Sequence, residues 1–407
     1  MQISVFSEVS RLEHVLIHRP GAELEQLTPS RLEHMLFDDI PFVTGAQKEH
    51  DAFAQALKKE GVKVHYLADL ITETLSQDEE IKKEFIEDFI SHSGQSAIYH
   101  SEEIGRLLLS FENTHDMVIK TMAGISLDEL NSSGSRPLAK LVRHESPFVT
   151  IPIPNLYFTR DPMASIGHGA SLSSMYAPTR KRETLYTKYI LKYHSCFSSP
   201  VPFYYDLNLP YPIEGGDILC LGNGLLLIGI SQRTAPEAIE LLSKNLFSDP
   251  NCHFKRILAL DIPKIRAFMH LDTVMTQVDV DCFTIHPAIL HNLKIYSIVP
   301  KAKGDIKVNE ESGKLHSILA KYMLSDNIKL IPCGGSDTIA AQREQWNDAS
   351  NTLCIRPGTV IVYDRNAVTN AIIQDEGINI IEIPGSELGR GRGGPRCMTM
   401  PLVRALE

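Results

Sequence analysis

The sequence predicts an α/β protein that carries an inserted all-helical segment. Near the N-terminus a strand, a helix and a second strand are expected in close succession, over 12–17, 48–58 and 62–67. From about residue 70 to residue 143 the chain is instead rich in Glu, Lys, Leu and Ile at helical spacing, and its first proline there is Pro137. Beyond this segment short apolar runs alternate with helical pieces again, which restores the α/β pattern.

Local patterns justify each expected element. The first strand is apolar and ends at the Pro20-Gly21 turn, and the first helix brings Phe53 and Leu57 to one face. Further strands are expected at 225–230, 255–260, 328–332, 359–363 and 378–383, and further helices at 79–90, 102–110, 115–122, 126–129, 235–244 and 313–320. We therefore divide the chain into an α/β domain, 1–70 and 145–407, and a helical insertion domain, 71–144.

Composition and charge exclude several classes of protein. The chain has 407 residues, of which 43% are apolar and 22% charged, as in ordinary globular proteins. Its net charge of −10 argues against a general nucleic-acid binder. No apolar run approaches the roughly 18 residues of a membrane helix, and the N-terminus has no secretory signal, so we expect a cytoplasmic protein. Seven cysteines without a C-x-x-C pair argue against a disulfide framework and against a zinc site built on cysteine pairs.

A glycine-rich basic segment precedes the last cysteine. Residues 389–394 fit the G-x-G-x-x-G pattern, but only 13 residues follow them, too few for a dinucleotide-binding unit. The segment better fits a flexible cationic loop in which Arg396 lowers the pKa of the adjacent Cys397 and so favours a thiolate nucleophile. A surface arginine cluster with an incidental cysteine stays open as the alternative.

Three other short motifs carry acidic groups or a histidine. In an extended strand His270 and Asp272 would face the same way, which suits an acid/base pair. Asp161 ends the strand-like run NLYFTRDP, and Glu214 precedes two glycines that would let a ligand approach the backbone. Taken singly, each motif is also compatible with a structural histidine or an acidic turn.

Together these motifs predict a specific kind of ligand. A thiol, an imidazole and three carboxylates would share one pocket, and gathered carboxylates repel one another unless a cation lies between them. A guanidinium is planar and always charged, and its five N–H donors suit carboxylate partners. The residues therefore predict a pocket for a guanidino compound.

The order of the motifs resembles a known family. SEVSRLEHVLIHRPG, LFDDI, NLYFTRDP, IEGGD, MHLDT, REQWND and GRGRGGPRCM follow one another nearly from end to end. On these motifs the chain resembles the bacterial arginine deiminases of the guanidino-group-modifying (pentein) superfamily. The resemblance implies a five-bladed pseudo-symmetric α/β propeller with an added helical domain.

The same resemblance implies roles for individual residues. Cys397 would be the nucleophile, His270 the general acid/base, and Asp161 and Asp272 the guanidinium clamps, with Glu214 supporting His270. A second group would hold the substrate's carboxylate, backbone and aliphatic stem: Asn155, Phe158, Arg180, Arg233 and Arg392.

The implied reaction is hydrolysis of L-arginine to L-citrulline and ammonia through a covalent cysteine intermediate, without a metal or organic cofactor. Binding of the cationic substrate would help to form the thiolate, and the loop of Arg392 would act as a lid. The resemblance further implies a homodimer or homotetramer. Agmatine deiminase, dimethylarginine hydrolase and amidinotransferase are the related alternatives, and a non-catalytic arginine sensor is the unrelated one. A papain-like peptidase is disfavoured, because in that class the cysteine precedes the histidine.

Overall fold

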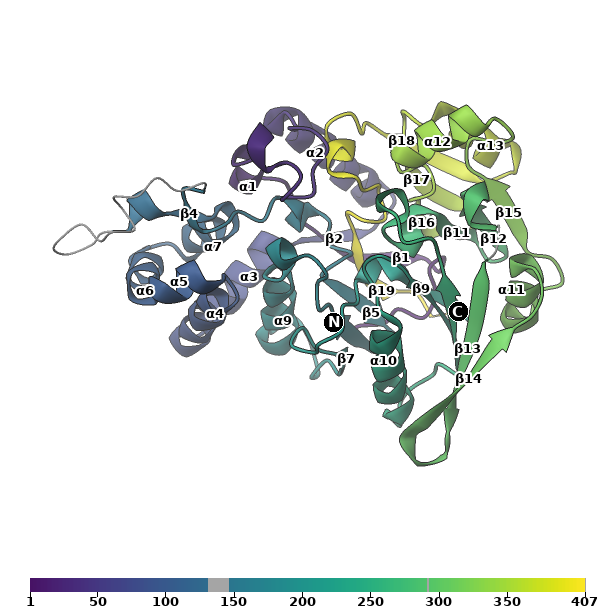
Figure 1. Ribbon diagram of the computed structural model, residues 1–407, viewed down its shortest axis with the longest axis horizontal. Coiled ribbons are helices and arrows are strands. Elements are labelled where there is room, and N and C mark those ends of the chain that lie inside the picture. Colours follow the sequence, from purple (N-terminus) through teal and green to yellow (C-terminus); the bar gives the residue numbers. More distant parts are fainter. Residues whose placement is uncertain (131–145, 291–292, 407) are drawn as a thin grey trace.

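Small mixed sheets with helices packed beside them make up the computed structural model (Figure 1), which describes residues 1–130, 146–290 and 293–406. Five of its sheets contain the same unit of three strands. In each unit the first two strands are antiparallel, and the third lies parallel to the second after a connection that contains a helix. Parallel neighbours require such a crossover, whereas antiparallel neighbours need only a short turn.

Four units follow one another along the chain. Listed as first strand, second strand, helix and third strand, they are β5 (Met163–Ile166), β6 (Gly169–Leu172), α9 (Glu183–Tyr193) and β7 (Phe203–Tyr205); β8 (Ile218–Gly222), β9 (Leu225–Ile230), α10 (Pro236–Ser248) and β10 (Arg256–Asp261); β11 (Met275–Asp279), β12 (Cys282–Ile285), α11 (Leu315–Met323) and β15 (Lys329–Pro332); and β16 (Leu353–Arg356), β17 (Thr359–Tyr363), α13 (Ala367–Asp375) and β18 (Asn379–Ile383).

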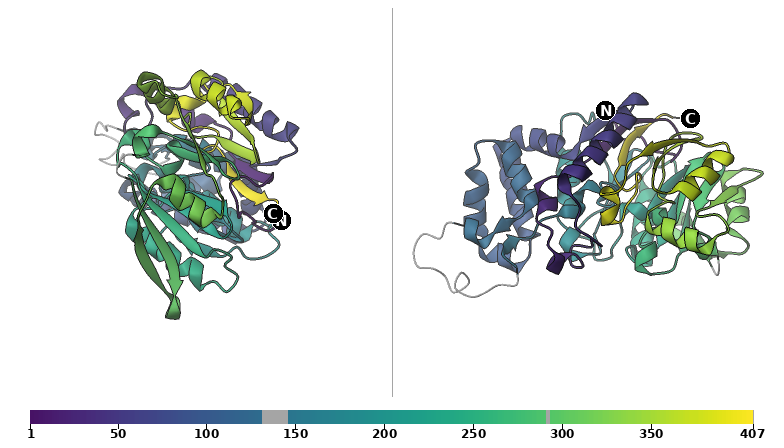
Figure 2. Two further views of the ribbon diagram at one scale, coloured as in Figure 1. Left: turned by 90° about the vertical axis from the view of Figure 1, so that its right-hand side faces the viewer. Right: turned by 90° about the horizontal axis from the view of Figure 1, so that it is seen from above.

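Strands from both ends of the chain form the fifth unit. β19 (Met400–Arg404) pairs antiparallel with β1 (Leu12–Ile17), and β2 (Lys63–Tyr66) lies parallel to β1 after α2 (Val43–Lys59). The marked N- and C-terminal ends accordingly lie together in the left view of Figure 2. Residues at opposite ends of the sequence therefore reach the same part of the molecule.

Two elements extend this pattern. β13 (Lys294–Lys301) and β14 (Asp305–Glu311) form a hairpin that adds to the sheet of β10 and projects from the body in Figure 1. α1 (Ala22–Glu25) lies before α2, and α12 (Thr338–Trp346) lies before β16.

The helical segment contains α3 (Leu67–Ser76), α4 (Glu79–Ser91), α5 (Gln95–Tyr99), α6 (Ser101–Leu109) and α7 (Thr114–Ala123), followed by the short pair β3 (Ile125–Ser126) and β4 (Phe148–Thr150). One apolar cluster joins these helices to α9, where the Phe85 ring lies 5.5 Å from Tyr186 and 5.2 Å from Tyr189. The helices therefore share a core with the β5 unit. The boundaries of the predicted insertion domain stay a prediction, and its residues 131–144 lie outside the described part of the chain.

The predicted elements of the longer apolar and amphipathic runs are confirmed. The strands at 12–17, 225–230 and 359–363 have the predicted bounds, and the helix predicted at 79–90 ends one residue later. Four- and five-residue strands such as β5 and β8 were not predicted, because they are buried throughout and show no alternation that distinguishes them from turns.

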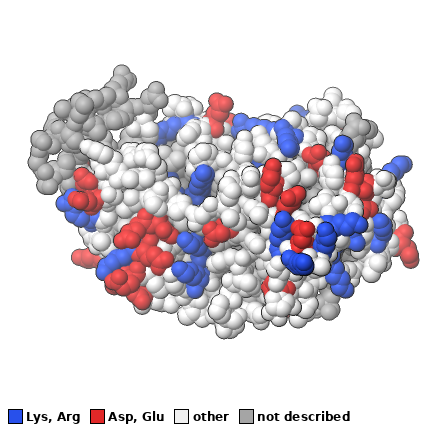
Figure 3. All heavy atoms as spheres, turned by 60° about the horizontal axis from the view of Figure 1, so that its bottom comes forward, with Lys and Arg blue, Asp and Glu red and all other residues white. Residues whose placement is uncertain are grey.

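The surface agrees with the charge balance of the sequence. Among the described residues no helix is both long and apolar enough to cross a membrane. On the face drawn in Figure 3, Lys and Arg side chains are interspersed with Asp and Glu side chains. The described part of that face therefore has no extended surface of one positive sign.

Candidate active site

The predicted site residues lie in the turns that lead into first strands. Asp161 precedes β5, Glu214 precedes β8, His270 and Asp272 precede β11, and Cys397 precedes β19. Corresponding positions of four units thus carry the groups that the sequence singled out.

Two of these turns differ from the predicted backbone. The extended strand expected over His270 to Asp272 is wrong, because Leu271–Thr273 forms a 3₁₀ turn that begins after His270. The carboxylate of Asp217 explains this turn, since its Oδ1 accepts a hydrogen bond from the backbone N–H of Leu271 at 2.8 Å. The strand-like run before Asp161 is also wrong, because Pro154–Tyr157 forms a 3₁₀ turn.

A buried ion pair joins the imidazole to a carboxylate. His270 Nε2 lies 2.7 Å from Glu214 Oε2, and His270 Nδ1 lies 3.8 Å from Asp161 Oδ1. Burial lowers the pKa of His270, but Asp161 and Glu214 outweigh burial and raise it to about 9. Burial raises the pKa of Glu214, but Arg233 and His270 outweigh it and lower it to about 2. The pair is therefore an imidazolium with a carboxylate at neutral pH.

Asp161 and Asp272 are held in the same manner. Asp161 Oδ2 accepts from Arg180 Nη1 at 2.7 Å, and Asp272 Oδ2 accepts from Arg396 Nη1 at 2.8 Å. The Oδ1 atom of each is buried and has no hydrogen-bond partner among the described residues. Each carboxylate thus has one oxygen fixed by a buried arginine and a second oxygen available to a ligand.

Cys397 is buried next to one of these carboxylates. Its Sγ lies 3.7 Å from Asp272 Oδ2. Burial, Asp272 and Asp161 raise the pKa of the thiol well above its ordinary value. The expectation that Arg396 lowers this pKa is wrong, because the Arg396 guanidinium binds Asp272 and, through Nε at 3.0 Å, Glu8. Its charge is therefore spent on two carboxylates.

A cavity of about 250 Å³ contains most of the predicted residues. Its lining includes catalytic and substrate-binding candidates from four units: Asn155, Phe158, Asp161, Arg180, Arg233, His270, Arg392 and Cys397. Asp272 and Glu214 lie directly behind this lining, in contact with Cys397 and His270 respectively.

Comparison with known proteins decides the family. A sequence profile with the description "Arginine deiminase" matches residues 33–404. The chain belongs to the arginine deiminase family. It is 48% identical over 403 residues to the arginine deiminase of Treponema denticola, covering 99% of this chain and 98% of that one. It is 50% identical over 404 residues to that of Streptococcus agalactiae, with the same coverage.

Solved structures support the fold of this arginine deiminase family member. DDAH from Pseudomonas aeruginosa superposes with a TM-score of 0.51 at 16% identity, covering 96% of this chain and 99% of that one. The N-terminal domain of ArgZ, an arginine dihydrolase from cyanobacteria, gives a TM-score of 0.53 at 13% identity, covering 96% and 97%. At these identities the likeness concerns the fold alone, which is the mixed α/β fold of the pentein enzymes.

Two arginines in the cavity of this family member have free donors. Arg392 stacks on Trp346 with 3.6 Å between guanidinium carbon and ring centre, and its three guanidinium nitrogens lack hydrogen-bond partners among the described residues. Arg233 has two such nitrogens, although its Nη1 lies 3.7 Å from Glu214 Oε2. Both could bind an anionic group of a ligand.

The other substrate-binding candidates are engaged with the protein. Arg180 donates to Asp161 and also, through Nε at 3.0 Å, to Glu183. Asn155 Nδ2 donates to the backbone O of Met35 at 2.8 Å. Phe158 packs so closely on Gly393 that a Cβ there would lie 2.3 Å from the ring.

The basic loop expected to be flexible is held in place. Its Leu388–Gly391 portion is a 3₁₀ turn, Arg390 forms an ion pair with Asp39, and the N–H of Asp38 donates to the O of Arg390 at 3.3 Å. These contacts join the loop to the segment before α2. Closure of this loop over a substrate stays a prediction.

Asp161, Glu214 and His270 also have ligand atoms close enough to share a metal ion, all within 4.8 Å of one another. Two arginines already balance this negative charge, Arg180 at 2.7 Å from Asp161 and Arg233 at 3.7 Å from Glu214. The arrangement suits an organic cation at least as well as a metal, and the expectation of a cofactor-free site stays a prediction.

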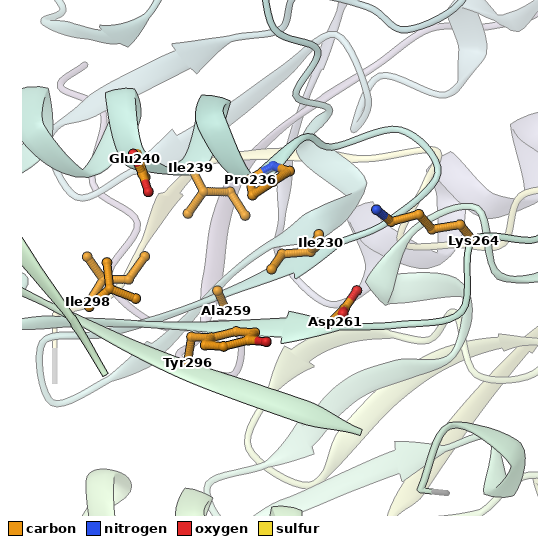
Figure 4. Close-up of a pocket in the computed structure, with 10 residues that line it drawn as sticks. Ile230, Pro236, Ile239, Glu240, Ala259, Asp261, Lys264, Tyr296 and Ile298 are labelled. Atoms are coloured by element: carbon orange, nitrogen blue, oxygen red, sulfur yellow. The ribbon is translucent and has the colours of Figure 1, made fainter. Parts of the chain in front are cut away.

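A second cavity, of about 310 Å³, lies between α10 and the sheet of β9, β10 and β13 (Figure 4). Apolar side chains such as Ile230, Ile239 and Ile298 line it, with Asp261 and Lys264 among its few charged residues. It has no thiol or imidazole in its lining. The chemistry of the family therefore has no groups to use there.

Sequence reasoning gave no role to several residues that organise the site. Glu8, Asp217 and Asn351 each hydrogen-bond to a catalytic candidate or to its neighbour. Glu8 lies within SEVSRLEHVLIHRPG and Asp217 within IEGGD, and Asn351 follows REQWND by three residues. Their position inside or beside the quoted motifs was the available signal.

Proposed function

We propose that this protein hydrolyses L-arginine to L-citrulline and ammonia. The observation that carries the proposal is the pair of carboxylates, Asp161 and Asp272, each with one oxygen fixed by an arginine and the other free, beside the Cys397 thiol. Two such oxygens match the N–H pairs of a planar guanidinium. Near-complete coverage by arginine deiminases at about half identity supports the same activity.

The first half of the reaction forms a covalent intermediate. The carboxylates hold the guanidinium plane so that Cys397 faces its central carbon, and the substrate's charge favours the thiolate. A bond forms between Sγ and this carbon. His270, a protonated imidazole at neutral pH, donates a proton to the departing nitrogen, and the C–N bond breaks to release ammonia.

The second half consumes water. His270, now neutral, accepts a proton as water adds to the thiouronium carbon. The C–S bond then breaks, citrulline leaves, and the sulfur is free again. Glu214 keeps His270 oriented and stabilises its protonated form in both halves through the 2.7 Å contact.

We assign the rest of the substrate to the other cavity residues. Arg233 and Arg392 would bind the α-carboxylate with their unpartnered N–H groups, and Phe158 would pack on the aliphatic stem. Asn155 and Arg180 would complete the backbone contacts, Arg180 chiefly by fixing Asp161. The loop of Arg392 would close on the bound carboxylate.

Three wider proposals accompany this assignment. The five units of one connectivity support a five-bladed pseudo-symmetric α/β propeller. Family membership supports a cytoplasmic enzyme that acts as a homodimer or homotetramer. The helical segment 71–144 would be a separate insertion domain attached to the β5 unit.

A substrate panel tests the activity. Purified protein should release citrulline and ammonia from arginine, whereas agmatine should react at least about 10³-fold more slowly, because without a carboxylate the desolvated Arg233 and Arg392 stay unpaired. Colorimetric citrulline and ammonia assays with arginine, agmatine and dimethylarginine measure this. Turnover of agmatine but not of arginine would overturn the substrate assignment.

The free enzyme should contain Cys397 as a thiol. Because burial and the neighbouring carboxylates raise its pKa, alkylation of Cys397 by iodoacetamide should accelerate with rising pH through at least pH 9. Peptide mass spectrometry follows the modified residue. A rate that levels off near or below neutrality would contradict substrate-assisted thiolate formation.

Gly216 should tolerate no side chain. A Cβ there would lie 2.8 Å from the His270 ring and 3.1 Å from Asp161 Oδ1, so Gly216→Ala should push the two apart and lower kcat/KM about 10- to 100-fold. Gly105→Ala is the matched control, because a Cβ at Gly105 meets nothing within 4 Å. Equal citrulline rates in both variants would show that this packing is not needed.

A further inference from the structure

The turn before β16 is the one unit entrance that has no assigned role. The other four entrances carry Asp161, Glu214, the His270–Asp272 pair and Cys397. In the β16 unit the equivalent turn runs over 348–352, and its Asn351 lies two residues before the strand, as Asp161 does before β5. Equivalent positions in the repeated unit therefore direct attention to Asn351.

The side chain of Asn351 connects the nucleophile to a clamp. Its Oδ1 accepts a hydrogen bond from the backbone N–H of Cys397 at 3.0 Å, and its Nδ2 donates to the backbone O of Asp272 at 3.0 Å. The first partner can only donate and the second can only accept, so only this orientation of the amide satisfies both. Asn351 is fully buried, so water cannot replace either bond.

Asn351 is itself rigidly held. Its own N–H donates to the backbone O of Asp348 at 2.9 Å, and the O of the preceding Ser350 accepts from Thr276 Oγ1 at 2.7 Å. A Cβ on Gly394 would lie 2.7 Å from the backbone O of Asn351, so the Cys397 loop packs directly on this residue. The amide is therefore an inelastic link between two turns.

We propose that Asn351 is a positioning residue that sets the separation between the Cys397 sulfur and the Asp272 carboxylate. It acts through backbone atoms and has no contact with the substrate. Cys397 and Asp272 are 125 positions apart in the chain, and their side chains meet only at the 3.7 Å sulfur–oxygen contact, so a bond between their backbones fixes that geometry. The inference rests on the proposed function, since the distance matters only if the sulfur attacks a carbon held by Asp272.

Replacement by alanine tests the link. Asn351→Ala removes both bonds, and a displacement of the sulfur by an ångström should lower kcat about 100-fold while KM changes less than about threefold. Asn370→Ala is the matched control, because Asn370 is also buried, belongs to the same unit, and makes two hydrogen bonds through Nδ2, to Tyr363 O and Glu382 Oε1. It should lose thermal stability but keep kcat.

Replacement by aspartic acid supplies a pH-dependent rescue. A neutral carboxylic acid can still accept from Cys397 N–H and donate to Asp272 O, whereas the anion cannot donate. The kcat of Asn351→Asp relative to wild type should therefore fall at least about tenfold between pH 5 and pH 8 as the carboxyl ionises. A purely structural contribution would not produce this ratio change, and the variant keeps the shape of asparagine if the alanine variant does not fold.

The outcomes separate this inference from the proposed activity. A folded Asn351→Ala with kcat within threefold of wild type, a kcat loss equal to that of Asn370→Ala, or an Asn351→Asp ratio that is constant with pH would overturn the positioning role. Wild-type protein that makes no citrulline would instead overturn the proposed function. In that case the iodoacetamide profile decides, since the Asn351→Asp anion should slow Cys397 alkylation at pH 8 at least about tenfold.

Discussion

Replacing Cys397 by alanine is expected to lower the kcat for arginine by at least about 10⁴-fold, the largest effect of any single change in this protein. Without sulfur no covalent intermediate forms, and water alone attacks a resonance-stabilised guanidinium carbon poorly. The carboxylates of Asp161 and Asp272 and the guanidinium of Arg392 remain, so arginine should still bind. Citrulline release measures the first expectation, and isothermal titration calorimetry measures the second.

Cys252→Ala is the control for this experiment, because Cys252 is partly exposed and hydrogen-bonds only to the backbone of Phe254 two residues away. It should retain the wild-type rate. A Cys397→Ala protein that still converted arginine would remove the thiol from the reaction. If wild type binds arginine without turnover and Cys397→Ala behaves identically, the protein is a sensor rather than an enzyme.

Replacing His270 by glutamine is expected to lower kcat about 10²- to 10⁴-fold, the usual range for loss of a general acid/base. Its contact with Glu214 at 2.7 Å and the nearby Asp161 keep the imidazole protonated up to about pH 9. In wild type, kcat/KM should therefore fall as pH rises through about 9, because neutral imidazole cannot protonate the departing nitrogen. The variant should lack this alkaline limb.

Stability should follow the same titration. The pKa of His270 is raised in the folded protein from 6.5 to about 9, so its contribution is fully present below pH 6.5 and is lost as pH rises through about 9. Chemical denaturation at pH 7 and pH 10 measures the difference. His168→Gln is the control, since His168 bonds to the backbone O of Ile3 outside the cavity. A wild-type rate that is constant to pH 10 would contradict the imidazolium assignment.

Local sequence determined the elements whose pattern is complete within one segment. Leu225–Ile230 is a continuous apolar run of strand length, and Glu79–Ser91 has an amphipathic period, so both were predictable. The turn at Leu271–Thr273 was not, because it depends on the Asp217 carboxylate, 54 positions away in the chain. The pKa of Cys397 was misjudged for the same reason, since the charge of Arg396 is paired with Glu8, 388 positions away.

The site residues themselves were found because their motifs are local and specific, whereas their mutual geometry is not local. Nothing in MHLDT or GRGRGGPRCM specifies that Asp272 and Cys397 share a bridging amide from Asn351. Side-chain links between turns of different units depend on how the units pack. Such links become visible only when all five units are in place.

Pairing of β19 with β1 has a consequence for newly made chains. Translation delivers Cys397 after every other residue of the cavity, and its strand then docks on a partner made at the start of synthesis. A nascent chain on the ribosome therefore already contains the cation-binding carboxylates but has no sulfur to react. The protein gains its reactive atom only as the final strand seals the molecule, which keeps that atom away from stray electrophiles during biogenesis.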